Sequence, residues 1–291
     1  MNRISRRDFI ARSAATVAAG VAAPALGQQV PSALTAGSLR PLGNSGIETT
    51  LLGMGTGVRA WSGESALTRK GDDVFFDVAT RAYEAGIRCF DLADMYGSHS
   101  YFKKLLQGPM DRGKVTLMTK TVAKEAEIAS EDLERFRKEL DTDMIDVVLM
   151  HCMTNPEWPT KMAPVMDVLE DAKAKGAIRA HGVSCHTLEA LQQAAESPWV
   201  DVIMARINPF GIKMDAEPEK VVPVLQTAHG NQKGVLGMKI AGEGDAVDRL
   251  SESLEFVLRL GCVDAMSVGF LAVEEVDDTV GKLNNAAANV V

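Results

Sequence analysis

Residues 86–97, which read GIRCFDLADMYG, decide the fold of this chain. The first five residues form a short and mostly apolar run, as expected for a strand that is buried on both faces of a parallel sheet. The strand ends abruptly at Asp91, and Asp94, Tyr96 and Gly97 follow at once. We therefore predict a buried strand whose carboxyl end carries polar side chains, although a surface tyrosine in an ordinary loop has the same local pattern.

Strands and helices alternate along the rest of the chain. From Leu51 onward we predict eight strands, each followed by a helix or by a loop and a helix. The strands are predicted at 51–57, 87–91, 115–120, 145–151, 178–184, 200–205, 234–239 and 265–269. The helices are predicted at 72–85, 100–107, 130–140, 160–175, 188–195, 219–228, 247–260 and 273–283. Eight such units in one domain of about 250 residues define an α/β fold, the (β/α)8 or TIM barrel.

A doubly wound open sheet is the alternative architecture for alternating strands and helices. Such a sheet usually carries a G-x-G-x-x-G fingerprint that opens a helix after its first strand. Residues 53–58 read GMGTGV, which lacks the third glycine and opens a loop. The barrel is therefore the predicted fold. Residues 39–48, with an Asn-Ser-Gly turn at 44–46, are predicted to form an N-terminal hairpin that caps one end of it.

The composition is that of an ordinary globular protein with one large domain. The 291 residues are 46% hydrophobic and 24% charged. The formal net charge of -8 argues against nucleic acid or an anionic membrane as a partner, because such surfaces need clustered Lys and Arg. The four cysteines have no metal-finger spacing and are expected to be mostly buried thiols, with a disulfide between Cys152 and Cys185 left open.

The amino terminus has the features of an export signal. Arg6 and Arg7 precede a short apolar stretch at 14–23 and an A-x-A cleavage pattern at 23–25, which resembles a twin-arginine signal. An amphipathic first helix is the alternative, but no polar stripe follows Ser13. We predict an export signal at 1–27, a linker at 28–37 and a barrel at 38–291, with the mature chain starting at about Leu26 in the periplasm. The twin-arginine export machinery is then a partner, and no stable membrane span is expected.

Four residues at neighbouring strand ends form the candidate catalytic group. In a barrel of this kind the active-site residues come from the carboxyl ends of the strands. Asp91 ends the second predicted strand and Tyr96 lies five residues on, while Lys120 ends the third strand and His151 the fourth. The ammonium of Lys120 is predicted to lower the pKa of the Tyr96 hydroxyl. Asp91 would hold Lys120 charged, and His151 would direct a substrate carbonyl toward the Tyr96 proton.

This group resembles the catalytic tetrad of the aldo-keto reductase family. The motif from Asp91 to Gly97, the strand-terminal Lys120 and the strand-terminal His151 carry the resemblance, which extends over about residues 39–283. It implies the reduction of an aldehyde, ketone or sugar carbonyl to an alcohol, or the reverse oxidation, with hydride carried by NAD or NADP. It also implies that Tyr96 is the general acid, Lys120 the modulator of its pKa, Asp91 the partner of Lys120, and His151 the donor that orients the carbonyl.

The cofactor-binding residues implied by the resemblance match less completely. Cys185 stands where the family often has asparagine, and residues 206–208 lack the usual Gln or Tyr. Lys239, ahead of the glycines at 242 and 244, would place a cation and free backbone N–H groups near a pyrophosphate. The predicted cofactor-binding set is Gly55, Thr56, Ser184, Cys185, Asn208, Lys239 and Gly269.

The segment after the eighth strand indicates which nicotinamide cofactor is accepted. Residues 269–278 read GFLAVEEVDD and contain no positive residue. A carboxylate suits a ribose hydroxyl and opposes an additional phosphate. We therefore predict that NAD is bound at least as well as NADP.

Two other classes of function match part of this pattern. A metal-dependent barrel hydrolase or isomerase would draw its ligands from Asp91, Asp94, His99, His151, His181 and His186. Against it, the first strand has no H-x-H, and the sixth to eighth strands end in no Glu or His. The second alternative is a barrel that keeps the reductase fold and has lost cofactor binding or catalysis, which is consistent with Cys185 and the acidic segment at 269–278.

The loops expected around the substrate are those at 60–70 and 153–160, which carry Trp61 and Trp158. The segment after Leu283 is predicted to be a tail too short to cover a substrate. The pocket is therefore expected to be open.

Overall fold

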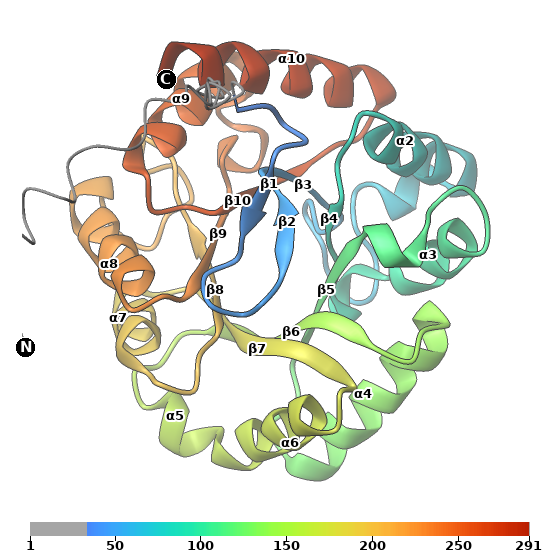
Figure 1. Cartoon of the computed structure of the whole chain (residues 1–291), viewed down its shortest axis with the longest axis vertical. Helices are drawn as coiled ribbons and strands as arrows, with labels where there is room; N and C mark the ends of the chain where they lie inside the picture. The colour runs from blue at the N-terminus through green and yellow to red at the C-terminus, as the bar shows by residue number, and fades with distance from the viewer. Residues whose placement is uncertain (1–33, 291) are drawn as a thin grey trace, which may run out of the picture. The chain divides into compact units, whose positions relative to one another are not determined.

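The structure is a computed structural model that describes residues 34–290. The predicted export signal at 1–27 lies outside the described residues, as do the first six residues of the predicted linker. Within the described part, eight parallel strands close into a barrel in the order β10-β3-β4-β5-β6-β7-β8-β9 (Figure 1). The predicted (β/α)8 barrel is confirmed. Among residues 34–290, no helix is long and apolar enough to cross a membrane.

The barrel strands are short and lie close to their predicted positions. They are β3 (Leu52–Gly55), β4 (Cys89–Asp91), β5 (Thr116–Thr121), β6 (Ile145–Met153), β7 (Ile178–Cys185), β8 (Val202–Arg206), β9 (Gly234–Met238) and β10 (Ala265–Gly269). Every residue of β3, β4 and β5 is buried, as a parallel sheet covered on both faces requires. Gly55 pairs with Asp91 on one side and with Gly269 on the other, so three predicted site residues lie at one level of the barrel.

Helices surround the strands on the outside of the barrel (Figure 1). They are α2 (Asp72–Glu84), α3 (His99–Leu106), α4 (Ala126–Leu140), α5 (Trp158–Lys161), α6 (Ala163–Ala174), α7 (Leu188–Glu196), α8 (Pro218–Gly230), α9 (Leu250–Leu260) and α10 (Val273–Val290). Short 3-10 turns are η1 (Thr68–Lys70), η2 (Asp94–Tyr96), η3 (Arg112–Lys114), η4 (Gly242–Gly244) and η5 (Val247–Arg249).

The last helix is longer than predicted. α10 continues past Leu283 to Val290, so the predicted tail is helical. Leu283, Ala286 and Ala287 are spaced three and four residues apart and are buried, which makes one apolar stripe on the helix. The Asn284 side chain accepts a hydrogen bond from the Ala36 N–H at 2.8 Å. This stripe and this bond hold the carboxyl end of the chain against the barrel.

Two other helices differ from prediction at their boundaries. α4 begins at Ala126, four residues before the predicted start, because 126–129 also has good helix formers. The helix predicted at 160–175 is broken at Met162 into α5 and α6. Pro164 explains the break, since proline has no N–H to donate and its ring clashes with the carbonyl four residues earlier.

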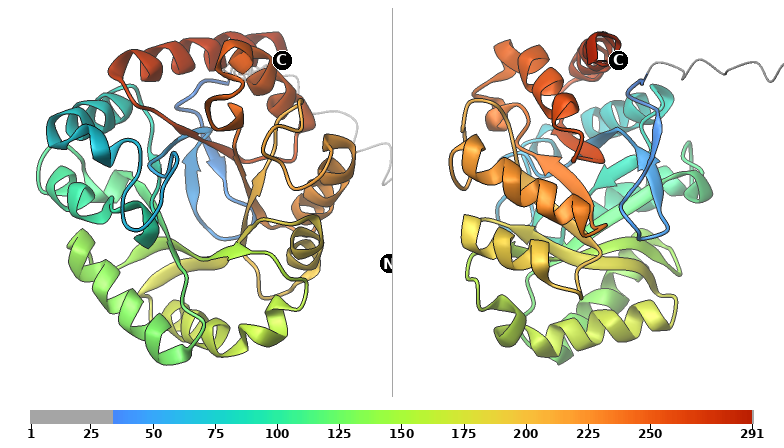
Figure 2. Two further views of the ribbon diagram at one scale, coloured as in Figure 1. Left: turned by 180° about the vertical axis from the view of Figure 1, so that it is seen from behind. Right: turned by 60° about the vertical axis from the view of Figure 1, so that its left-hand side comes forward.

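The predicted capping hairpin is confirmed. It consists of the antiparallel strands β1 (Leu39–Pro41) and β2 (Glu48–Thr50). Leu42 and Ile47, each 1% exposed, pack into the barrel interior with residues that include Met118. Figure 2 shows the hairpin at one end of the barrel in its side view. The carboxyl ends of the strands lie at the opposite end of the barrel, and the candidate active site is located there.

Candidate active site

Lys120 and Asp91 form a buried ion pair at the mouth of the barrel. The Lys120 ammonium donates to the Asp91 carboxylate, and also to the carbonyl oxygen of Leu92 at 2.9 Å. Ser267 on β10 donates to the second carboxylate oxygen of Asp91, at 2.9 Å. Lys120 is 1% exposed and Asp91 4% exposed. Three strands thus contribute to one satisfied charge cluster, which matters because an unpaired buried charge is strongly destabilising.

Tyr96 is held between a glycine and this ion pair. It ends the turn η2, and Gly97 follows in the left-handed conformation, at φ 66°. The Lys120 ammonium lies 4.8 Å from the centroid of the Tyr96 ring. On the other side, a Cβ atom added to Gly57 would lie 2.4 Å from Tyr96 Cζ. Glycine at position 57 is therefore what leaves room for the ring.

His151 on β6 faces the Tyr96 hydroxyl. The hydroxyl oxygen lies 3.4 Å from His151 Nε2. The pairing of β6 with β7 is irregular between Met150 and Met153, and Cys152 has a φ of 62°. Such irregularities occur next to active sites, where they redirect side chains. The long distance is typical of a catalytic hydrogen bond without substrate.

Burial sets the protonation of both residues. It raises the pKa of the Tyr96 hydroxyl well above its usual value, and the charge of Asp91 adds to this effect. For His151, burial first and then the charge of Lys120 lower the pKa to about 2. At neutral pH Tyr96 is therefore protonated and His151 is neutral. The lowered pKa predicted for the Tyr96 hydroxyl is therefore not found, because burial favours the uncharged phenol and the Lys120 ammonium is paired with Asp91.

A cavity of about 250 Å³ extends from Tyr96 and Asp91 to the amino terminus of α10. Of the seven predicted cofactor-binding residues, Gly55, Lys239 and Gly269 line it. Its walls also include the apolar side chains Met204, Met238 and Phe270 and the acids Glu243, Glu275 and Asp278. The cavity thus joins the proton-donor end of the site to a helix amino terminus, which is an anion-binding position in many proteins.

The other four predicted cofactor-binding residues are not among the residues that line this cavity. Thr56 is fully buried, and its N–H donates to the Asp91 carbonyl oxygen at 3.0 Å. Ser184 accepts a hydrogen bond from the Cys152 N–H at 2.9 Å. The Asn208 amide group donates to the carbonyl oxygens of residues 212 and 239 and accepts from the N–H of 210. Cys185 is fully buried. These contacts brace the loops around the site.

Lys239 and the start of α10, two positive features of the cavity, are already paired within the chain. The Lys239 ammonium lies 2.7 Å from a carboxylate oxygen of Glu243. Burial favours the neutral form of Glu243, but the hydrogen bond and charge of Lys239 hold its pKa below the usual value. At the start of α10, the Leu271 N–H donates to the Glu275 carboxylate at 2.7 Å. An anionic ligand that binds Lys239 or the start of α10 therefore has to compete with an acidic side chain, Glu243 or Glu275.

Sequence reasoning missed a chain of polar contacts beside His151. The Arg206 guanidinium donates to His186 Nδ1 at 2.5 Å and to the buried Asp215 carboxylate at 2.9 Å. Because a guanidinium only donates, His186 carries its proton on Nε2, which lies 3.6 Å from Cys152 Sγ. Burial, followed by the charge of Arg206, lowers the pKa of His186 to about 4. His186 directly follows β7 and Arg206 ends β8, and these positions at strand ends could have indicated in the sequence that both residues lie near the site.

The six residues considered as metal ligands serve different purposes. Asp91 and His151 lie in the mouth, whereas His99 bonds to Glu139 on α4 and His181 stacks on the Trp199 ring at 4.1 Å. Within residues 34–290, no three His, Cys, Asp or Glu side chains are grouped so that they could hold a metal ion.

The two tryptophans in the loops expected around the substrate differ in burial. Trp158 is 2% exposed, donates to the Ala190 carbonyl oxygen at 3.4 Å and packs near Trp199. It is a core residue. Trp61 is 76% exposed.

A TIM barrel with this arrangement of Tyr, Lys, Asp and His beside a long cavity defines a barrel oxidoreductase. The chain belongs to the aldo/keto reductase family, whose model matches residues 52–246. It is therefore an NAD(P)-dependent carbonyl oxidoreductase, and the resemblance found in the sequence is confirmed at the level of the family.

Two similar solved structures carry the same family description. A Pseudomonas aeruginosa protein described as an aldo-keto reductase shares 25% identity over 88% of this chain and 98% of its own, with a TM-score of 0.73. An aldo-keto reductase from Bacillus halodurans, solved in its holo form, shares 17% identity over 87% of this chain and 96% of its own, with a TM-score of 0.70. No curated protein matches this chain.

Proposed function

We propose that this protein reduces an aldehyde, ketone or sugar carbonyl to an alcohol, or catalyses the reverse oxidation, with Tyr96 as the general acid. The observation that carries the proposal is the contact of the Tyr96 hydroxyl with His151 beside the buried pair of Lys120 and Asp91. A protonated phenol and a neutral imidazole N–H can both donate to one carbonyl oxygen. The oxygen would receive its proton from Tyr96.

The cavity has the features needed for a nicotinamide dinucleotide. Gly55 and Gly269 give a wall without side chains, Met204 and Met238 give an apolar surface for a ring, and Lys239 supplies a cation. When bound, the nicotinamide supplies the hydride that adds to the carbonyl carbon. The chain's own part is to orient the carbonyl through His151 and to deliver the proton to its oxygen.

We propose that NAD is bound at least as well as NADP. Glu275 and Asp278 line the cavity near the start of α10, where an additional phosphate would meet like charge. Fluorescence titration of the purified protein with NADH and NADPH tests this, and a Kd for NADPH well below that for NADH would contradict it. Glu275→Gln is expected to improve NADPH binding more than NADH binding.

Turnover with a panel of carbonyl compounds tests the function itself. Aldehydes, ring ketones and sugars are mixed with NADH or NADPH, and the absorbance of the reduced cofactor is followed. We expect consumption that depends on at least one carbonyl compound. Binding of both cofactors without any consumption would favour a reductase-like barrel that has lost catalysis, and absence of binding would favour one that has also lost its cofactor.

We also propose that the protein is exported by the twin-arginine machinery to the periplasm. The support is the sequence SRRDFI at 5–10, followed by the apolar stretch and the cleavage pattern. Replacing both arginines, as Arg6→Lys and Arg7→Lys, is expected to retain the full-length chain in the cytoplasm. Amino-terminal sequencing of the exported protein should find a start near Leu26, and export of the double variant at the normal rate would contradict the assignment.

A further inference from the structure

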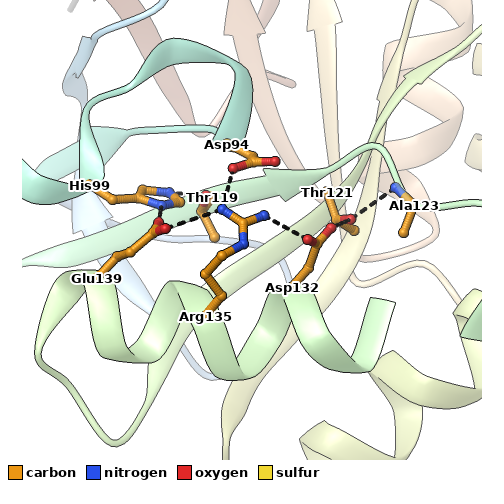
Figure 3. A network of polar contacts seen from close by, with 8 residues as sticks. All are labelled: Asp94, His99, Thr119, Thr121, Ala123, Asp132, Arg135 and Glu139. Atoms are coloured by element: carbon orange, nitrogen blue, oxygen red, sulfur yellow. Dashed lines mark hydrogen bonds and ion pairs between the residues drawn. The ribbon is translucent and has the colours of Figure 1, made fainter. Parts of the chain in front are cut away.

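We propose that Arg135 on α4 is a positioning residue that holds the Tyr96 turn and the Lys120 strand in one fixed arrangement. Figure 3 shows its guanidinium at the centre of a polar network that lies between α4, the turn η2 and β5. None of the other groups in this network belongs to the proposed catalytic group. The activity measurements below rest on the proposed function, whereas the exchange measurement does not.

The first attachment is to the turn that carries Tyr96. Arg135 donates to the Asp94 carboxylate at 2.6 Å, and Asp94 is the first residue of η2, two positions before Tyr96. Further along, His99 Nδ1 lies 2.8 Å from the Glu139 carboxylate, which itself accepts from Arg135 at 3.2 Å. The segment from Asp94 to His99 is therefore tied to α4 on both sides of Tyr96 (Figure 3).

The second attachment is to the strand that carries Lys120. Arg135 donates to Asp132 at 2.6 Å, and the other oxygen of Asp132 accepts from the Thr121 hydroxyl at 2.5 Å. The Thr119 hydroxyl lies 2.7 Å from His99 Nε2. Successive side chains of a strand point to opposite faces, so Thr119 and Thr121 face α4 while Lys120 faces the barrel interior. Both neighbours of Lys120 thus join the network.

The charges of the network depend on one cation. Asp94, Asp132 and Glu139 all contact Arg135, and the hydrogen bond to Asp94 is the main cause that raises the pKa of the guanidinium. The hydrogen bond from His99 keeps the pKa of Glu139 below its usual value, against the opposing effect of burial. A planar guanidinium holds its donors in a rigid fork, whereas the donors of an ammonium rotate about a compact head. Arg135 is partly exposed, so its contribution is geometric more than energetic.

The arrangement matters because the Tyr96 hydroxyl and the Lys120 ammonium reach the mouth from different elements. The hydroxyl lies at the end of a long side chain, so a small rotation of η2 moves it away from His151. Displacements of about 1 Å at a reacting group are costly in rate. Without Arg135, we expect the turn to move relative to β5 while the part of the cavity from Lys239 to the start of α10 is unchanged.

The experiment compares Arg135→Met and Asp94→Ala with Arg137→Met. Arg137 is on the same helix and pairs with Glu134 within it, at 2.7 Å, so it controls for loss of an arginine from α4. Amide hydrogen exchange of peptides that cover residues 93–99 is expected to become faster in the first two variants and to stay at the wild-type rate in the control. Wild-type exchange in both Arg135→Met and Asp94→Ala would overturn the proposal, whatever the activity.

The kinetic measurement distinguishes positioning from general damage. With an accepted carbonyl, kcat should fall about tenfold in Arg135→Met and Asp94→Ala, while the Kd for NADH stays within about twofold. In a Tyr96→Phe background, Asp94→Ala should cause no further loss. An equal loss with and without the Tyr96 hydroxyl would overturn the proposal. If the wild type reduces no carbonyl, the proposed function fails and the exchange rates alone decide the role of Arg135.

Discussion

The two sides of the barrel mouth differ in how their charges are used. On the side of β4, β5 and β6, Lys120 and Asp91 neutralise each other in the interior and set the surroundings of Tyr96. On the side of β9, β10 and α10, Lys239 is paired with Glu243 and the start of α10 is occupied by Glu275. The first pair is buried, whereas Lys239 and Glu243 are each about a quarter exposed.

This difference separates chemistry from binding. On the proton-transfer side, burial already sets the protonation states of Tyr96 and His151 before a ligand binds. On the cofactor side, an anionic cofactor has to compete with the chain's own acids for Lys239 and for the helix terminus. Changes on the first side should therefore reduce stability or kcat, and changes on the second should alter affinity.

Breaking the buried ion pair should have the largest effect. Lys120→Met leaves the Asp91 carboxylate buried without its partner, and we expect a loss of about 3–5 kcal/mol in the free energy of unfolding. Urea denaturation measures it. Lys282→Met, which removes the surface partner of Asp278 on α10, should change stability by less than about 1 kcal/mol. Equal losses in the two variants would contradict the distinction between buried and exposed pairs.

The second largest effect is expected from a substitution that fills the space between residue 57 and the Tyr96 ring. In Gly57→Ala the new methyl group would overlap the Tyr96 ring, so the hydroxyl must move away from His151. We expect kcat to fall by about 10-fold to 100-fold, with little change in the Kd for NADH. Gly281→Ala is the matched control, because a Cβ atom there meets nothing within 4 Å. An unchanged kcat in Gly57→Ala would show that the ring position is not critical.

Stability should fall in acid because His151 is buried in its neutral form. Its pKa is about 2 in the folded protein and near 6.5 when unfolded, so below pH 6.5 the unfolded state binds the proton and is favoured. Above pH 6.5 His151 is neutral in both states, so its burial does not reduce the free energy of unfolding. Below pH 6.5 that free energy falls as the pH falls. Between about pH 6 and pH 4.5, the free energy of unfolding should depend less on pH in His151→Asn than in the wild type. The two slopes should differ by up to about 1.4 kcal/mol per pH unit. Equal slopes in variant and wild type would contradict the burial of a neutral imidazole.

Releasing Lys239 should have the smallest effect. In Glu243→Gln the ammonium loses its ionic partner, and we expect the Kd for NADH to fall about fivefold, or roughly 1 kcal/mol, with kcat nearly unchanged. Isothermal titration at low and high salt measures this. Glu255→Gln removes a similar pair with Arg259 on the outside of α9 and serves as the control. Weaker binding in Glu243→Gln would mean that the carboxylate itself contacts the cofactor.

The fold and the proton-transfer residues were predictable because each rests on a local pattern. Short apolar strands alternating with helices indicated the barrel, and the positions of Lys120 and His151 at strand ends brought them to one mouth. The break at Met162 and the full length of α10 were missed, although Pro164 and the stripe of Leu283, Ala286 and Ala287 were visible in the sequence.

The rest of the site depends on contacts that no local pattern contains. The raised pKa of Tyr96 results first from burial and then from the nearby charge of Asp91, two features that exist only once the barrel is closed. The bonds of Asn208 to its own loop, and the link from Arg206 through His186 toward Cys152, join residues on different elements. Sequence spacing named several of these residues but could not assign their partners.

The central claim is that Tyr96 delivers the proton to the carbonyl oxygen, and Tyr96→Phe tests it most directly. The variant removes one hydroxyl and leaves the ring between Gly57 and Lys120 in place. In a single turnover with enzyme-bound NADH and an accepted carbonyl, we expect the rate to fall by about 10²-fold to 10⁴-fold with NADH binding unchanged. Reduction at the wild-type rate would contradict the account.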